Sequence, residues 1–151
     1  IVYEINNIIN ENTNPGQFIT FFIGLWNSCD HSFEYINAGH NPPIIIKNDN
    51  SIIQLKATGF FLGPIPKTEY KTEKIFFNQG DTIAIYTDGI DETFNPDYDQ
   101  FGVDRIIETL IENKEKCAEE ICNILYERAE IFANGSPIMD DATIIVSRVV
   151  E

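Results

Sequence analysis

The first two thirds of the chain change from a helical to a strand-like pattern of apolar positions. Residues 1–11 carry apolar side chains at helical spacing, which predicts an opening helix. Short apolar runs then alternate with turns rich in Asn, Asp and Gly, a pattern typical of antiparallel strands. The run that begins at Phe18 is almost continuously apolar, which predicts a strand covered on both faces. The predicted strands are residues 18–26, 33–38, 44–46, 52–55, 70–77 and 82–86.

From Val103 onward the apolar positions follow a helical period. Residues 103–111 and residues 118–132 each place their apolar side chains on one face, which predicts two helices that pack on a sheet. Residues 142–150 return to a strand pattern. Strands, then a pair of helices, then a final strand predict an α+β fold.

Acidic side chains stand at the ends of two predicted strands. Asp88 follows the sixth strand, and Gly89 after it allows the backbone to turn sharply or to approach an ion or phosphate closely. Asp140 and Asp141 stand directly before the final strand. Taken separately, Asp88 is explained as a helix cap and the Asp140–Asp141 pair as capping and solvating a loop. Together, two acidic clusters that reach one sheet edge predict a shared divalent cation.

The composition fits one folded domain and limits the classes of partner. The chain has 151 residues, of which 43% are hydrophobic, enough for one domain with a core over residues 1–151. Its formal net charge is -14 at pH 7. Non-specific affinity for nucleic acid depends on clustered Lys and Arg, so this charge argues against a nucleic-acid partner.

The cysteines and the chain start predict a cytoplasmic piece of a longer protein. Cys29, Cys117 and Cys122 form no CxxC pair, which indicates a reduced chain. Every apolar run is shorter than the roughly 20 residues of a membrane helix, and no signal peptide is visible. The first residue is Ile1 rather than Met, and no capping residue precedes the opening helix.

The two histidines do not support nucleophilic catalysis. No serine lies in a GxSxG motif, and neither His31 nor His40 belongs to a pair with metal-ligand spacing. We interpret His31 as a turn residue and His40 as a residue that orders a loop. No catalytic residue beyond metal ligands is therefore expected.

Five short segments, in this order, carry a resemblance to a known family. They are INAGHNPPIII (36–46), GFFLG (59–63), QGDTIAIYTDGIDE (79–92), FGVDR (101–105) and MDDATIIV (139–146). Together they resemble the C-terminal part of the bacterial SpoIIE-type branch of the metal-dependent PPM serine/threonine phosphatases. The resemblance covers nearly the whole chain.

This resemblance implies a fold, a metal centre and a substrate class. The implied fold is a sandwich of two antiparallel sheets flanked by helices, with a two-metal centre of Mn²⁺ or Mg²⁺ at one end. Asp88 and Asp140 are implied to ligate the same metal ion, with Asp141 and Gly89 in supporting positions. The implied reaction is hydrolysis of phosphoserine or phosphothreonine, with anti-anti-sigma (STAS-type) regulators as substrates in partner switching.

The chain also departs from the family pattern. The family's N-terminal segment contains an early aspartate and a GHG motif with the metal-bridging carboxylate, and no such residues precede the opening helix here. We therefore expect this N-terminally truncated domain to bind metal weakly and to have little or no activity alone. Missing strands would expose a sheet edge, so self-association is also expected.

A non-catalytic function is the alternative to an enzyme. The chain would then be a protein-interaction module or a piece of a pseudophosphatase. The presence of both Asp88 and Asp140 favours an enzyme, because neighbouring carboxylates repel each other when no cation lies between them.

Overall fold

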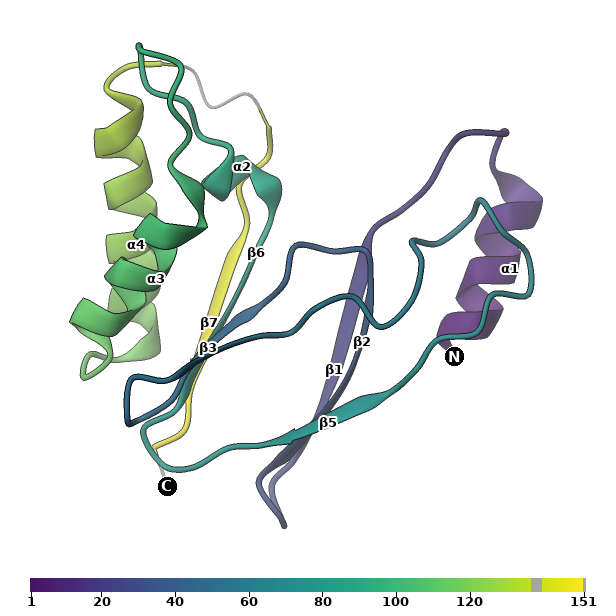
Figure 1. Cartoon of the computed structure of the whole chain (residues 1–151), viewed down its shortest axis with the longest axis horizontal. Coiled ribbons are helices and arrows are strands. Elements are labelled where there is room, and N and C mark those ends of the chain that lie inside the picture. The colour runs from purple at the N-terminus through teal and green to yellow at the C-terminus, as the bar shows by residue number, and fades with distance from the viewer. Residues whose placement is uncertain (137–139, 151) are drawn as a thin grey trace. The chain divides into compact units, whose positions relative to one another are not determined.

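The computed structural model describes residues 1–136 and 140–150, which form two compact units (Figure 1). Unit 1 comprises Ile1–Pro42 and Leu55–Phe77, and unit 2 comprises Pro43–Gln54 and Asn78–Glu151. Each unit has its own antiparallel sheet. Met139, the first residue of the MDDATIIV segment, lies outside the described residues.

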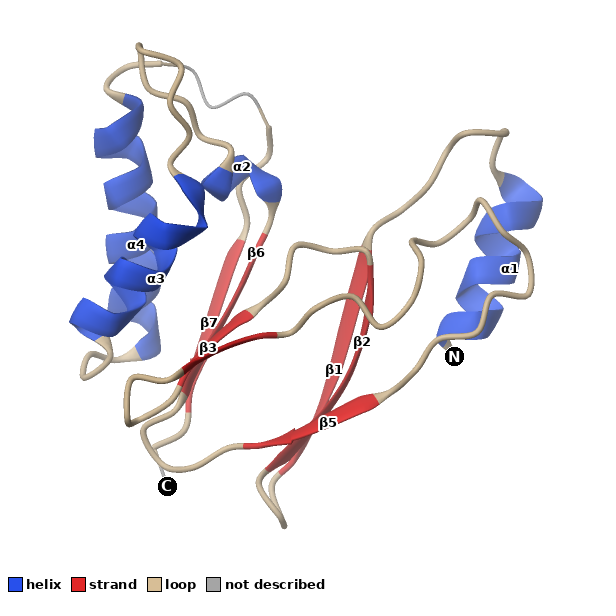
Figure 2. Ribbon diagram, viewed as in Figure 1, coloured by secondary structure: helices blue, strands red, loops and turns tan. Residues whose placement is uncertain are grey.

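Unit 1 consists of one helix and a three-stranded sheet. The helix α1 spans Val2–Asn12, and the strands are β1 (Phe21–Asn27), β2 (Ser32–Ala38) and β5 (Glu73–Phe76). All neighbouring strands are antiparallel, in the order β1-β2-β5 (Figure 2). The loop between β1 and β2 contains His31, whose positive φ of 53° agrees with its interpretation as a turn residue.

The helix α1 is held in unit 1 by apolar packing and by one buried amide. Val2 packs with Ala38 in a small core. Asn6 is fully buried, and its Oδ1 accepts a hydrogen bond from the Gly63 amide at 2.9 Å while its Nδ2 donates to the Ile65 carbonyl at 2.9 Å. The buried amide side chain therefore fixes α1 to the end of the GFFLG segment and to the loop that follows it.

The strand β1 differs from its prediction. A strand covered on both faces was expected, but the side chain of Leu25 is 68% exposed and that of Trp26 is 41% exposed. In the sheet of unit 1, β1 is an edge strand with a neighbour on one side. An apolar run indicates a strand but does not specify its position in the sheet, which is why the prediction of full coverage was wrong.

Unit 2 contains a four-stranded antiparallel sheet and three helices. The strands are β3 (Ile44–Ile46), β4 (Ile52–Gln54), β6 (Thr82–Tyr86) and β7 (Ile144–Arg148), in the order β4-β3-β6-β7. The helices are α2 (Asp88–Asp91), α3 (Gly102–Asn113) and α4 (Ala118–Ala133). The longer helices α3 and α4 lie side by side next to this sheet (Figure 2).

One face of the sheet in unit 2 forms a core with the two longer helices. Alternate residues of β3 and β6 point to this face, as the period of two requires. The apolar faces predicted for α3 and α4 pack against them. The buried members of this core are Ile44, Ile46, Ala84, Tyr86, Ile90, Phe101, Ile106, Leu110, Ile121, Leu125 and Ala129.

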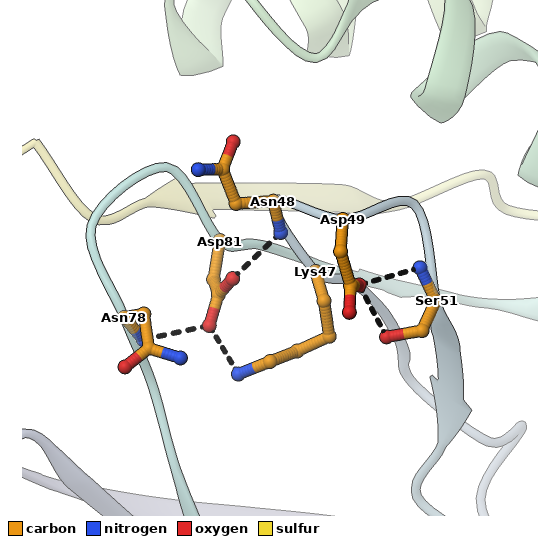
Figure 3. A network of polar contacts seen from close by, with 6 residues as sticks. All are labelled: Lys47, Asn48, Asp49, Ser51, Asn78 and Asp81. Carbon is orange, nitrogen blue, oxygen red and sulfur yellow. Dashed lines mark hydrogen bonds and ion pairs between the residues drawn. The ribbon is translucent and has the colours of Figure 1, made fainter.

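A buried carboxylate anchors the start of β6. The side chain of Asp81 is 1% exposed and forms an ion pair with Lys47 (Figure 3). Its Oδ1 accepts a hydrogen bond from the Asn48 amide at 2.9 Å, and its Oδ2 accepts one from the Asn78 amide at 2.7 Å. Asp81 thus ties the β3–β4 loop to the turn that precedes β6.

The predicted fold class is confirmed as α+β, with two antiparallel sheets and helices. The strands predicted at residues 44–46 and 82–86 have the predicted bounds, whereas β1, β5 and β7 are shorter than predicted. That residues 1–151 form one domain stays a prediction. Among the described helices, none is long and apolar enough to cross a lipid bilayer.

Candidate metal site

The end of β6 presents Asp88 to solvent. β6 is mostly buried, and its pairing with β3 on one side and β7 on the other fixes its backbone. Tyr86 is its last residue, Thr87 follows in extended conformation, and Asp88 begins the helix α2. Asp88 is exposed, whereas Gly89 and Ile90 next to it are buried. A rigid strand therefore positions a solvated carboxylate.

The antiparallel pairing of β6 and β7 brings the second acidic cluster to the same end of the sheet. Tyr86 is opposite Ile144, and the Thr87 amide donates to the carbonyl of Thr143 at 3.1 Å. Asp140 and Asp141 lie directly before this pair and are both exposed. Asp88 and the Asp140–Asp141 pair, 52 or more positions apart in the sequence, are thus neighbours in unit 2. The predicted juxtaposition at one sheet edge is present.

The hydroxyl of Thr87 fastens the two segments to each other. Its Oγ1 donates a hydrogen bond to the carbonyl of Asp141 at 2.9 Å and accepts one from the amide of Thr143 at 2.9 Å. Sequence reasoning missed this residue, although its place directly before Asp88 could have suggested it. Thr87 fixes the backbone that carries the acidic side chains on both sides of the site.

Replacing Thr87 by valine is expected to lower the free energy of unfolding by about 1–2 kcal/mol, because the Thr143 amide and the Asp141 carbonyl lose their partner. Valine keeps the branched shape of threonine, so packing changes little. Urea unfolding followed by circular dichroism measures the change. Thr143→Val is the matched control, and an equal loss in both variants would contradict a role for the Thr87 hydroxyl.

Gly89 permits a close approach of backbones between the two segments. A Cβ atom at this position would lie 2.7 Å from the carbonyl oxygen of Asp141 and 3.0 Å from that of Asp140. Real Cβ atoms essentially never come within 2.7 Å of another heavy atom, so a side chain here would displace one of the two segments. The close approach at Gly89 is thus to the Asp140–Asp141 backbone. The approach to an ion or phosphate that the sequence suggested stays a prediction.

The carboxylates of Asp88 and Asp140 differ in their hydrogen bonds. Within the described residues, the Asp88 carboxylate has no hydrogen-bond or ion-pair partner. Asp140 Oδ1 accepts a hydrogen bond from the Asp141 amide at 2.8 Å. The helix cap of α2 is Thr87 and not Asp88, so the interpretation of Asp88 as a cap is wrong. One oxygen of Asp140, Oδ1, stabilises the loop through this hydrogen bond, as the alternative interpretation of this residue expects.

The donor set fits part of a divalent-cation site. Carboxylate oxygens are the preferred ligands of hard cations such as Mg²⁺ and Mn²⁺, and the two clusters offer them at one end of the sheet. Among residues 1–136 and 140–150, however, no group of three or more His, Cys, Asp or Glu side chains is arranged to hold a metal ion. A complete site would require ligands in addition to these.

Tyr86, the last residue of β6, lies next to the candidate site. Burial, with a smaller contribution from the charge of Asp91, raises the pKa of Tyr86 to about 12, so this phenol stays protonated at neutral pH.

The backbone of His40 is held by Asn37, whose Oδ1 accepts a hydrogen bond from the His40 amide at 2.8 Å and whose Nδ2 donates one to the His40 carbonyl at 3.0 Å. This contact agrees with the loop interpretation of His40.

Curated relatives share the sequence over nearly the whole chain. Protein IcfG of Synechocystis sp. is 30% identical over 138 residues, which are 91% of this chain and 22% of that protein. Phosphoserine phosphatase RsbU of Bacillus subtilis is 28% identical over 151 residues, 98% of this chain and 44% of RsbU. The chain thus spans less than half the length of either relative.

Solved structures share the fold. The SiaA-PP2C domain of Pseudomonas aeruginosa superposes with a TM-score of 0.81 at 15% identity, covering 95% of this chain and 57% of that one. The phosphatase domain of SpoIIE from Bacillus subtilis, presoaked with Mn, gives 0.65 at 21% identity, covering 99% and 65%. RsbX in complex with magnesium gives 0.67 at 19% identity, covering 96% and 61%.

A protein-family model also matches the chain. The model described as Stage II sporulation protein E (SpoIIE) matches residues 1–150, which include both acidic clusters. The chain therefore belongs to the SpoIIE family, the SpoIIE-type branch of the PPM (PP2C) phosphatases.

Proposed function

We propose that the chain is part of a metal-dependent protein serine/threonine phosphatase domain, in which Asp88 and Asp140 bind one divalent cation. The observation that carries this proposal is the juxtaposition of the two acidic clusters by the β6–β7 pair. The Thr87 hydrogen bonds and the close approach at Gly89 hold the clusters in place. Asp141 supports the site through its amide, which fixes one oxygen of Asp140.

The proposed cofactor is Mn²⁺ or Mg²⁺, in a two-metal centre of the complete domain. The donors that the chain offers are carboxylate oxygens, and two structures with this fold come from crystals with manganese or magnesium. When bound, such ions supply a hydroxide from water at neutral pH and neutralise the phosphoryl oxygens. The chain's own residues contribute by holding two carboxylates on a rigid sheet edge.

The proposed substrate is a phosphoserine or phosphothreonine protein. RsbU, a relative of this chain, is named a phosphoserine phosphatase. By kinship the substrate would be a phosphorylated anti-anti-sigma (STAS-type) regulator, and the reaction would take place in the cytoplasm as part of partner switching.

The 151 residues alone are proposed to hold the cation weakly. Octahedral Mg²⁺ or Mn²⁺ takes about six ligands, of which Asp88 and Asp140 would supply two, and water the remainder. We therefore expect little or no phosphatase activity from this chain by itself.

A manganese titration tests the ligand assignment. We expect Asp88→Asn and Asp140→Asn each to weaken Mn²⁺ binding about tenfold relative to the unaltered chain, because each removes one charged ligand. Calorimetry or the water-proton relaxation of Mn²⁺ measures the dissociation constant. Asp104→Asn, at an exposed position of α3, is the matched control and should bind as the unaltered chain does.

Two outcomes would contradict separate parts of the proposal. If Asp88→Asn binds Mn²⁺ as tightly as the Asp104→Asn control, Asp88 is not a ligand and the interaction-module alternative gains support. If the chain alone hydrolyses a phosphoserine peptide with Mn²⁺, and Asp88→Asn abolishes this, the ligand assignment stands but the expectation of an inactive piece is wrong.

A further inference from the structure

A groove between α3 and α4 is separate from the candidate metal site. It has a volume of about 310 Å³, and the residues that matter for its chemistry are Arg105, Glu108, Thr109, Arg128, Ile131 and Phe132. Arg105 is the last residue of the FGVDR segment, to which the phosphatase proposal gives no role. We name this feature the α3–α4 groove.

Arg105 is a fixed cation in this groove. Its guanidinium carbon lies 4.5 Å from the ring centroid of Phe132, within the range of a cation–π contact. Its Nη1 donates to the carbonyls of Gln100 at 3.1 Å and Phe101 at 2.7 Å. Within the described residues, Nη2 and Nε of Arg105 have no acceptor. The planar group is therefore oriented in advance and keeps donors for a ligand.

The second arginine of the groove is already neutralised. Arg128 Nη1 donates to Thr109 Oγ1 at 3.1 Å, and Nη2 forms an ion pair with Glu112 at 2.6 Å. Glu108 also lines the groove and adds a negative charge near Arg105. The groove can therefore accept one carboxylate at Arg105, and a ligand with many negative charges would be repelled.

Apolar surface lies next to this cation. The side chain of Ile131 is 77% exposed, although it is a large aliphatic group on a helix. The ring of Phe132 is partly buried and borders the same groove. Water contact with this surface is unfavourable, so an apolar side chain of a ligand would gain free energy by covering it.

We propose that the α3–α4 groove binds a short segment of a partner protein that carries one carboxylate beside a bulky apolar side chain. Charge complementarity selects this occupant: the carboxylate pairs with Arg105, and the apolar side chain packs on Ile131 and Phe132. The net charge of -14 repels a polyanion such as nucleic acid.

Selection of 12-residue peptides from a random library by the 151-residue chain tests this proposal. We expect enriched peptides with an Asp or Glu next to Leu, Ile, Phe or Trp. Their affinity is measured by fluorescence anisotropy. Ile131→Glu, at a position too exposed to affect folding, and Arg105→Gln should each weaken binding at least tenfold. Arg148→Gln, which removes an arginine outside the groove, should bind within about twofold of the unaltered chain.

Other outcomes overturn the proposal. The proposal is wrong if the enriched peptides lack acidic residues or if no peptide is enriched. It is also wrong if Ile131→Glu binds the peptides as tightly as the unaltered chain does. Displacement of a bound peptide by a short single-stranded DNA would show that the groove recognises negative charge alone. Since Ile131→Glu does not remove any contact within the described core, its result stays interpretable even if Arg105→Gln unfolds.

Discussion

Replacing Asp81 by alanine is expected to lower the free energy of unfolding by about 3–5 kcal/mol. The carboxylate is 1% exposed and accepts from the Lys47 ammonium and from the amides of Asn48 and Asn78. Alanine would leave Lys47 without this counter-ion and two amides without an acceptor, and each buried unsatisfied group adds to the cost. The network joins two loops of unit 2, so its loss weakens the start of β6 (Figure 3).

Urea denaturation followed by circular dichroism measures this loss. Asp49→Ala is the matched control, because Asp49 lies in the same β3–β4 loop but is exposed and accepts only from Ser51, within the described residues. A small change is expected for this variant. Similar losses for Asp81→Ala and Asp49→Ala would show that burial and the ion pair with Lys47 contribute little.

The sequence predicts β6 well because its local signals agree. A turn at residues 78–81 precedes an uninterrupted β-branched and apolar run, and an aspartate follows within two residues of its end. The structure gives the strand the same bounds, Thr82–Tyr86. What the sequence does not reveal is that Asp81 is buried with Lys47, since Lys47 and Asn48 come from another loop. Periodicity reports which face is apolar and not which distant polar group pairs.

In the candidate site too, the features set by local sequence could be predicted and the contacts between distant segments could not. The acidic clusters could be assigned to strand ends from the sequence, and antiparallel pairing of the two strands then makes them neighbours. The two hydrogen bonds of the Thr87 hydroxyl were not predicted, because a threonine beside a turn has many ordinary interpretations and its place directly before Asp88 is a weak signal. The exposure of β1 was also not predictable, since an apolar run reads alike in edge and central strands.

Gly89→Ala is expected to lower the free energy of unfolding by about 3 kcal/mol and to weaken Mn²⁺ binding about tenfold or more. The added Cβ would lie 2.7 Å from the Asp141 carbonyl oxygen, a backbone atom that cannot rotate away as a side chain can. Relief of the clash requires the start of α2 to separate from the Asp140–Asp141 segment. Because Asp88 lies on one of these segments and Asp140 on the other, the proposed ligands would move apart.

Gly59→Ala separates these two effects. A Cβ at position 59 would lie 2.5 Å from the ring of Tyr70 in unit 1, so this variant also loses stability. It leaves the Asp88 and Asp140 segments unchanged, and its Mn²⁺ affinity should equal that of the unaltered chain. Mn²⁺ titration of both variants at a temperature where each is folded decides between the alternatives. Equal Mn²⁺ affinities for the two would mean that the close approach at Gly89 serves folding alone.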